Sequence, residues 1–340
     1  FSLYNWPPVA GKGVLEPLDA YVEEDNYDLD DFYPQIIKPY RYDGKRFGQG
    51  KLYGLPKEIA IRAFYYNVDM WREAGLREPD PSHPMSWEEY LAALKALTKR
   101  DGRRVTQYGL VSDDWWGIWA IWAWANGGEM VDDPWKPTKA TLDDPKVIEG
   151  LEFFARLATE HGVLVPLAVA AEQGKSEMFA SRRAACYYNG RWMVPLFRQS
   201  RGLNFEVMPT PSGKAGPAQL LTGSMFGVSA TSKHKEAAWK LLSYVVGKQG
   251  QVEMTKLGLL LPSRRSVAES DLFLKSTPPH NNQVFINDLK YTRILPLHPK
   301  YMEMEKVVGD EFKLALVGEK SVADAMKSAN EKVNQLLQSK

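Results

Sequence analysis

The chain has 340 residues and a mass of 38.5 kDa, and its 43 Lys and Arg against 42 Asp and Glu give a net charge of +1. No run of Lys and Arg exceeds two residues, which argues against a nucleic-acid-binding protein. The mean hydropathy is −0.38, and the chain lacks the apolar stretch of roughly 18 residues that a transmembrane helix needs.

Short strands and helices alternate along the first 200 residues. An apolar, aromatic run over 59–66 predicts a buried strand. Ser86, with Glu89 three residues later, forms a capping box and predicts a helix start, whereas Asn126-Gly127-Gly128 predicts a helix end. The predicted elements are the strand 59–66, the helices 69–75 and 86–98, the strand 105–111, the helices 115–125 and 147–161, a helix from 176 and the strand 184–188.

The second half of the chain continues this mixture. Strands are predicted over 205–208 and 225–228, around a loop rich in Pro and Gly. The predicted helices are 235–246, 249–257, 303–316 and 322–337. Neither an internal repeat nor a low-complexity segment interrupts the pattern, which is typical of an α/β fold.

Residues for metal binding or nucleophilic catalysis are few and badly spaced. No histidine lies four residues from another, the spacing that places two imidazoles on one helix face. Cys186 is the single cysteine, so no intramolecular disulfide or cysteine-based zinc site is expected, and its apolar neighbours predict a buried thiol. We therefore expect no metal and no cofactor. Paired carboxylates for glycosidase chemistry stay open, because the 42 acidic residues offer many pairs.

The number and clustering of tryptophans are the unusual features of the composition. The chain has eleven, and five of them fall between Trp115 and Trp124. Indoles are seldom fully enclosed, because the ring N–H requires a partner. Trp119 and Trp122 fall at helical spacing and are expected in the core. Trp6, beside two prolines, is the tryptophan least expected there.

Aromatic and polar residues together predict a recognition site for sugars, which present apolar C–H faces and hydroxyl edges. The candidates lie mostly in predicted loops or near element ends, where binding groups tend to sit. They are Asn5, Trp6, Glu58, Arg62, Asp113, Asp114, Trp115, Trp116, Asn189 and Trp192.

Several motifs occur in the order found in one known family. Lys51-Leu52-Tyr53-Gly54-Leu55-Pro56 is followed by residues 63–76, which contain Tyr66-Asn67-Val68-Asp69 and end in Gly75-Leu76. Further motifs follow in order at 84–89, 126–128, 189–192, 235–239 and 258–264. Together they cover nearly the whole chain, which resembles the extracellular sugar-binding proteins of bacterial ABC importers, the maltose-binding-protein-like family 1 solute-binding proteins.

The resemblance implies a two-lobed α/β periplasmic-binding-protein fold of type II, with hinge strands between the lobes. The first lobe would comprise 1–62 and 222–268, and the second 63–221 and 269–340. Family members begin with two strands and two helices before the segment that matches Phe1 to Trp6. The resemblance therefore implies that this chain starts inside the first lobe, without the signal segment.

The resemblance also carries site residues onto this sequence. The family's Trp-bearing turn matches Gly190-Arg191-Trp192, whose indole would stack on a sugar ring. Its hinge motif matches Thr222-Gly223-Ser224, with Thr222 in place of the first glycine. Gly223, Ser224 and Arg264 thereby join the candidates.

The implied function is a receptor without chemical turnover. It would bind a mono- or oligosaccharide between the lobes and deliver it to the permease subunits of an ABC importer. We expect a monomer in the periplasm or outside the cell, either free or lipid-anchored. Two alternatives stay open: a carbohydrate-active enzyme such as a glycosidase, or the same fold binding a polyol, a phosphorylated polyol or a polyamine.

Overall fold

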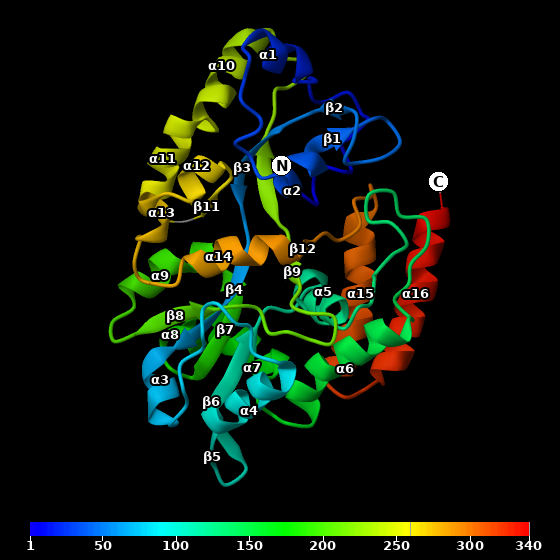
Figure 1. Ribbon diagram of the computed structural model, residues 1–340. Coiled ribbons are helices and arrows are strands. Elements are labelled where there is room, and N and C mark those ends of the chain that lie inside the picture. The colour runs from blue at the N-terminus through cyan, green and yellow to red at the C-terminus, as the bar shows by residue number, and fades with distance from the viewer. Residues whose placement is uncertain (259, 340) are drawn as a thin grey trace.

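The computed structural model describes residues 1–258 and 260–339, which form an upper part and a lower part (Figure 1). The upper part contains a three-stranded sheet in the order β10 (Gly223–Phe226), β3 (Leu55–Ile59) and β11 (Leu261–Pro262). Both outer strands run antiparallel to β3, and Ser224 and Pro262 lie opposite Glu58. The central strand thus holds Glu58 at the end of the sheet nearest the lower part.

Short helices and one hairpin surround this sheet. The hairpin joins β1 (Arg41–Tyr42) and β2 (Lys51–Leu52). The helices of the upper part are α1 (Asp19–Glu24), α2 (Pro34–Ile37), η1 (Lys38–Tyr40), α10 (Lys235–Val245), α11 (Lys248–Lys256), α12 (Arg265–Ala268) and α13 (Asp271–Leu274).

The lower part is built on a five-stranded sheet. Its strands, in spatial order, are β5 (Lys99–Asp101), β6 (Arg104–Ser112), β7 (Ala184–Gly190), β4 (Arg62–Asn67) and β8 (Phe205–Met208). Only the pair β6 and β7 is parallel among these described strands. A separate parallel pair, β9 (Gln219–Leu220) and β12 (Thr292–Arg293), lies near the boundary with the upper part.

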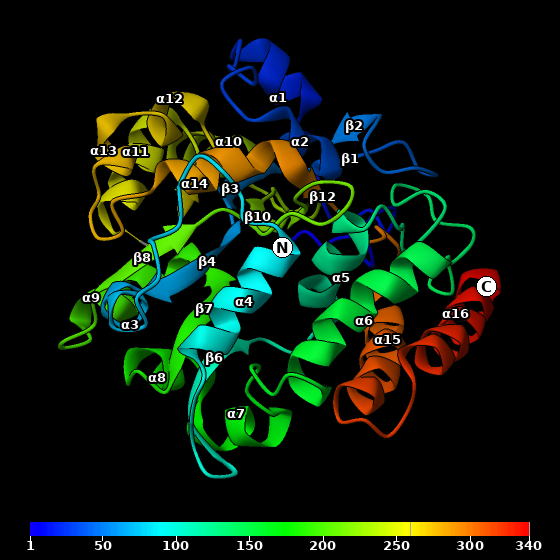
Figure 2. The same ribbon diagram turned by 60° about the horizontal axis from the view of Figure 1, so that its bottom comes forward.

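Helices cover this sheet, and further helices lie to one side of it. In Figure 2, α6 lies beside the last two helices, α15 and α16. The helices of the lower part are α3 (Val68–Glu73), α4 (Trp87–Leu97), α5 (Trp116–Ala125), α6 (Pro145–Thr159), α7 (Leu167–Gln173), α8 (Lys175–Ala180), η2 (Arg191–Met193), α9 (Val194–Gln199), α14 (Gln283–Asn287), η3 (Asp288–Tyr291), α15 (Tyr301–Leu316) and α16 (Val322–Gln338). None of the helices within the described residues is long and apolar enough to cross a membrane.

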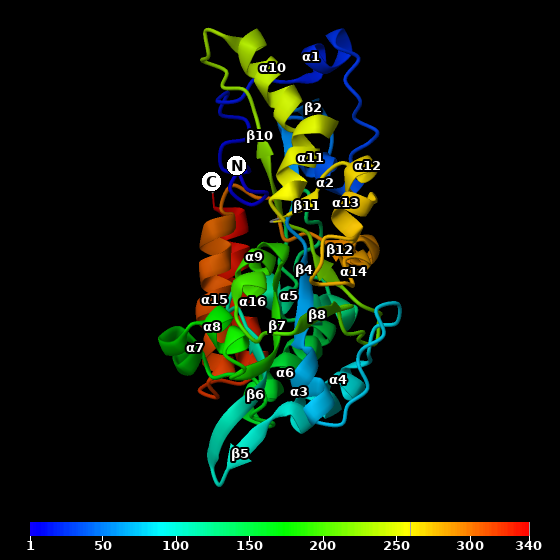
Figure 3. The same ribbon diagram turned by 90° about the vertical axis from the view of Figure 1, so that its left-hand side faces the viewer.

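The chain passes between the two parts where one continuous strand was expected. The prediction of a single strand over 59–66 is wrong, because β3 ends at Ile59 and β4 begins at Arg62, in a different sheet. Figure 1 shows these two strands nearly in line across the boundary, and Figure 3 shows β4 extending upward from the lower part. Ile59 and Ile61 are both buried, so hydrophobicity alone gives no sign of the break.

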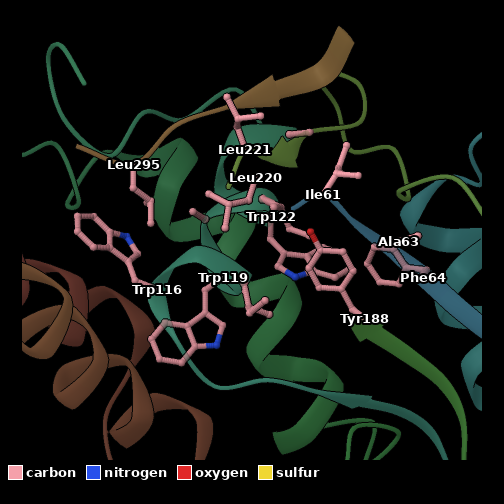
Figure 4. Packing of buried hydrophobic residues seen from close by; sticks show 14 of the residues in the cluster. Ile61, Ala63, Phe64, Trp116, Trp119, Trp122, Tyr188, Leu220, Leu221 and Leu295 are labelled. Atoms are coloured by element: carbon pink, nitrogen blue, oxygen red, sulfur yellow. The ribbon is translucent and has the colours of Figure 1, made fainter. Parts of the chain in front are cut away.

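The tryptophan-rich segment forms α5, as predicted, and it is buried on all sides. All ten of its residues are buried, which is typical of a helix enclosed by a core rather than one lying on its surface. Trp119 and Trp122 lie in that core, as their spacing predicts (Figure 4). The helix packs against α6 and α15, and its end at Asn126 agrees with the Asn-Gly-Gly signal.

Local sequence signals gave most element positions. The capping box of α4 is present in both directions, since Ser86 Oγ accepts from Glu89 N and Glu89 Oε2 accepts from Ser86 N. The strand Phe205–Met208 agrees residue for residue. The strand predicted over 225–228 begins two residues earlier, at Gly223, because it pairs with β3 there. Cys186 is buried in β7, as predicted, and burial raises the pKa of its thiol to about 12.

Candidate functional site

A buried arginine lies between two tryptophans just below the crossing. Arg62 is the first residue of β4, and its guanidinium carbon lies 5.2 Å from the ring centroid of Trp115 and 5.1 Å from that of Trp192. Arg62 is 6% exposed, whereas both indoles are half-buried. Three predicted residues from separate stretches of the chain therefore meet at one point. We call Arg62, Trp115, Trp192, Asp113, Tyr187 and Asn189 the arginine cluster.

Two glycines allow the indoles to lie where they do. A Cβ atom at Gly190 would overlap the Trp192 ring, and one at Gly117 would overlap the Trp115 ring. Gly190 also lies opposite Arg62 in the β4–β7 pair, which brings η2 and its tryptophan next to the arginine. The backbone thus approaches both rings too closely for any larger residue.

The carboxylate of Asp113 faces this cluster from the end of β6. It accepts hydrogen bonds from Tyr187 Oη and Asn189 Nδ2, each at 3.2 Å, and Lys175 Nζ lies 3.9 Å away. Burial raises the pKa of the Asp113 carboxyl, while the positive charges of Lys175 and Arg62 act in the opposite direction. The arrangement holds acceptor oxygens in the same cluster as Arg62, whose positive charge acts on them.

Its neighbour Asp114 has a different role. This carboxylate pairs with Lys175, to which it is hydrogen-bonded, and with Lys313 of α15 at 3.3 Å. Although burial acts to raise the pKa of Asp114, the two lysines outweigh it and hold the pKa below its ordinary value. Asp114 therefore fastens the loop before α5 to α8 and α15.

On the upper side of the crossing, Glu58 and Ser224 form a pair. Ser224 Oγ donates to Glu58 Oε1 across β10 and β3, and Lys57 Nζ lies 3.2 Å from Glu58 Oε2. The hinge motif keeps its close backbone approach at Gly223, where a Cβ atom would lie 2.7 Å from the carbonyl oxygen of Glu58. The threonine that replaces the family's first glycine therefore leaves this approach intact.

Two predicted tryptophans lie in the core. Trp6 is 1% exposed, its Nε1 donates to the Pro39 carbonyl at 3.0 Å, and its ring packs against Tyr53 and other aromatic residues. The expectation that Trp6 is least suited to the core is wrong, because the turn around the two prolines folds inward. Trp116 is also 1% exposed and stacks on Tyr301 with an interplanar angle of 7°. Neither ring offers a free face to a ligand.

Two predicted polar residues also lie apart from the arginine cluster. Arg264 is 4% exposed in the upper part, where it donates to the Val246 carbonyl and pairs with Asp31 at 3.4 Å. Its side chain is thus paired by its own surroundings in the upper part, apart from the arginine cluster. Asn5 is exposed, and among the described residues no hydrogen bond joins its side chain to the cluster.

Sequence reasoning missed two contributors to the site. Tyr187 lies two residues before Asn189 in β7, so both side chains lie on one face of the strand. That spacing is a signal that would have found the tyrosine once Asn189 was a candidate. Lys175, the partner of Asp113 and Asp114, begins α8 and carries no comparable signal.

The family comparison agrees with the resemblance in the motifs. The sequence model of the family described as "Bacterial extracellular solute-binding protein" matches residues 2–280. A putative binding protein of Brucella abortus (strain 2308) is 23% identical over 333 residues, which cover 96% of this chain and 76% of that protein.

Solved structures show the same fold. An ABC substrate-binding protein from Listeria monocytogenes, in complex with cycloalternan, has a TM-score of 0.89 at 23% identity and covers 100% of this chain and 84% of its own. A solute-binding protein of an ABC transporter from Thermotoga lettingae TMO, bound with alpha-D-tagatose, has a TM-score of 0.82 at 25% identity, with 99% and 84% covered. The chain therefore has the predicted two-lobed periplasmic-binding-protein fold, whereas the lobe boundaries given above stay a prediction.

Proposed function

Since the chain belongs to the family of bacterial extracellular solute-binding proteins, we propose that it binds a mono- or oligosaccharide and delivers it to an ABC importer. Its structural neighbours include proteins whose complexes hold cycloalternan and tagatose. The cargo of this chain would lie at the arginine cluster, between the upper and lower parts.

One observation carries this proposal: Arg62 lies between Trp115 and Trp192, and the Asp113 carboxylate, bonded to Tyr187 and Asn189, belongs to the same cluster. The indoles supply apolar faces for sugar C–H groups, while Arg62 offers donors and Asp113 offers acceptors to hydroxyls. A mismatched sugar would leave some of these groups unpaired, at a cost of roughly 1–3 kcal/mol each. Such a site selects by the positions of hydroxyl groups.

The arginine also bears on the alternative cargoes. A polyamine would bring several positive charges next to a buried guanidinium, and like charges repel strongly where water is excluded. A neutral polyol meets no such objection, but it lacks the flat apolar face that two indoles would cover. These points favour a sugar over a polyamine and over a neutral polyol.

We further propose that the protein performs no chemical step. The two candidate carboxylates accept hydrogen bonds from neighbouring donors: Asp113 from Tyr187 and Asn189, and Glu58 from Ser224. A glycosidase needs one carboxyl free to give a proton and another free to act as a base or nucleophile. The importer permease as partner, the monomeric state, the location outside the cytoplasmic membrane and the free or lipid-anchored form are parts of the same proposal.

A thermal-shift screen against mono-, di- and oligosaccharides tests this function, followed by calorimetry of each hit. A ligand at 100 times its dissociation constant raises the free energy of unfolding by about 2.7 kcal/mol. A shift with one group of sugars, and no hydrolysis of the bound sugar, is the expected result. Turnover of an aryl glycoside that disappears when Asp113 or Glu58 is replaced would instead establish the enzyme.

A further inference from the structure

Arg62 differs from the other charged side chains around it in lacking a counter-ion. Glu58, Asp113 and Asp114 each accept hydrogen bonds from neighbouring side chains. Among the residues that the structure describes, no carboxylate oxygen lies within 4.0 Å of the Arg62 guanidinium, and its Nε and Nη1 have no hydrogen-bond partner. A positive charge that is 94% buried is thus left without a directed acceptor, since the residue is 6% exposed.

Such a charge is costly unless something pairs with it. Buried ions in proteins are paired or hydrogen-bonded, because removal from water is otherwise strongly unfavourable. The indoles of Trp115 and Trp192 stabilise the cation through their ring faces, but neither offers an acceptor to the N–H groups. Asp113 belongs to the same cluster, but neither of its oxygens comes within 4.0 Å of the guanidinium nitrogens. The guanidinium thus keeps N–H donors that the described residues leave unpaired.

We infer that the sugar taken by this site carries a carboxylate, as a uronic acid or as an oligosaccharide with a uronic acid unit. The carboxylate pairs with the guanidinium of Arg62, and the sugar ring packs on Trp192. This inference rests on the proposed function and names the substrate class of the same site.

A carboxylate fits the site better than a phosphate. The guanidinium fork matches a planar carboxylate through two parallel hydrogen bonds, and one positive charge balances one negative charge. A phosphate monoester carries a charge of about −1.5 to −2 at neutral pH and would need a second cation. The ammonium group of Lys175 is already paired with Asp114, and the charge of Asp113 also acts on Arg62.

Isothermal titration calorimetry with matched sugars tests the inference on the unmodified chain. The pairs are D-glucose with D-glucuronate, D-galactose with D-galacturonate, and galactobiose with digalacturonate, and glucose 6-phosphate serves as the phosphate probe. We expect the acidic member of at least one pair to bind about tenfold more tightly or better, a difference of 1.4 kcal/mol.

A substitution then assigns the preference to one side chain. Arg62→Gln should remove the preference for the acid over its neutral partner, whatever affinity for the neutral sugar is lost with it. Arg103→Gln, in the exposed turn between β5 and β6, should change neither the preference nor the affinities. Circular dichroism and thermal melts establish whether both variants fold. If Arg62→Gln does not fold, the titrations of the unmodified chain with the matched sugars still decide whether the acidic sugar is preferred.

The outcomes separate this inference from the function on which it rests. Equal binding of neutral and acidic members overturns the inference and leaves the sugar receptor standing. Preference for glucose 6-phosphate over glucuronate overturns the carboxylate assignment. Failure of every sugar, neutral or acidic, overturns both.

Discussion

Ala60 and Thr222 are hydrogen-bonded in both directions where the chain crosses from the upper to the lower part. Ala60 N donates to the Thr222 carbonyl at 2.9 Å, and Thr222 Oγ1 donates back to the Ala60 carbonyl. Ala60 lies between the end of β3 and the start of β4, and Thr222 immediately precedes β10. These bonds therefore join the two crossing segments at a point that belongs to neither sheet. The threonine in place of glycine therefore adds a side-chain bond at the crossing.

Thr222→Val should lower the free energy of unfolding by about 1 kcal/mol, the usual net value of one hydrogen bond, because the shape is kept and the donor lost. Urea denaturation measures the change. Thr231→Val, at an exposed position, is the matched control and should alter stability by less than about 0.5 kcal/mol. Equal stability of the two variants would show that the Thr222 hydroxyl contributes nothing at the crossing.

The contacts of Arg264 lie within the upper part, so we predict that it stabilises the fold and does not bind the ligand. The guanidinium lies 4.3 Å from the Phe32 ring centroid and pairs with Asp31, whose side chain is 16% exposed. Arg264→Met would remove the positive charge that pairs with this carboxylate, while Ser266 N and Oγ would still donate to it. We therefore expect a loss of about 1.5–3 kcal/mol in the free energy of unfolding, the usual value for hydrogen bonds to a charged group. Sugar affinity, measured below the melting temperature, should stay within about twofold of the unmodified chain.

The neighbouring Arg265 is the control for that experiment. It is exposed, so Arg265→Met should cost no more than about 1 kcal/mol. A large fall in sugar affinity with Arg264→Met in a folded protein would return Arg264 to the binding site.

Local signals in the sequence were sufficient for most elements, but not for the contacts between them. The capping box at Ser86 and the Asn-Gly-Gly end of α5 act within one turn of chain, so they can be recognised without knowing the fold. The break between Ile59 and Arg62 depends on two sheets that form from distant segments. Short helices such as α7 and α9 were missed because one or two turns carry too little periodicity to be recognised.

The candidate site shows the same division. The resemblance placed Trp192 at the site, and composition pointed to Arg62 and Trp115. Only the fold shows that the guanidinium of Arg62 lies against the indole rings of both tryptophans. Asp113 and Asp114 are equivalent in the sequence. In the structure, Asp113 accepts from Tyr187, whereas Asp114 pairs with Lys175. The difference depends on partners that lie far away along the chain.

Asp288 should make stability depend on pH. It is 1% exposed and accepts from Thr210 Oγ1 at 2.8 Å and from Thr210 N at 3.2 Å. Burial raises the pKa of its carboxyl from 3.8 to about 6, although these hydrogen bonds act to lower it. Because the folded state holds the proton more tightly, this contribution is fully present below pH 3.8 and is lost as the pH rises through about 6.

The difference in unfolding free energy between the unmodified chain and Asp288→Asn isolates this contribution. Between pH 4 and pH 7, the free energy of unfolding of the variant should rise relative to that of the unmodified chain by up to about 3 kcal/mol, since one pKa unit corresponds to 1.36 kcal/mol. Urea titrations at several pH values measure it. A difference that stays constant over this range would mean that Asp288 does not titrate with a raised pKa.

Trp192 gives the most direct test of where the ligand lies. Its indole is half-buried beside Arg62 and rests over Gly190, so Trp192→Ala removes a binding face without opening the main core. We expect sugar affinity to fall by about tenfold or more, because 1.4 kcal/mol is a factor of ten and a buried aromatic contact is worth at least that. Calorimetry with the sugar found in the screen measures the change, and circular dichroism establishes that the variant folds.

Trp135 is the matched control. It is a half-buried tryptophan with a lysine over its ring, as Lys38 Nζ lies 4.7 Å from the centroid, but it belongs to a loop outside the arginine cluster. Trp135→Ala should leave affinity within about twofold of the unmodified chain. If the two variants weaken binding equally, the loss is a general effect of removing a tryptophan. If Trp135→Ala alone weakens it, the ligand lies beside Lys38 and Trp135 rather than beside Arg62.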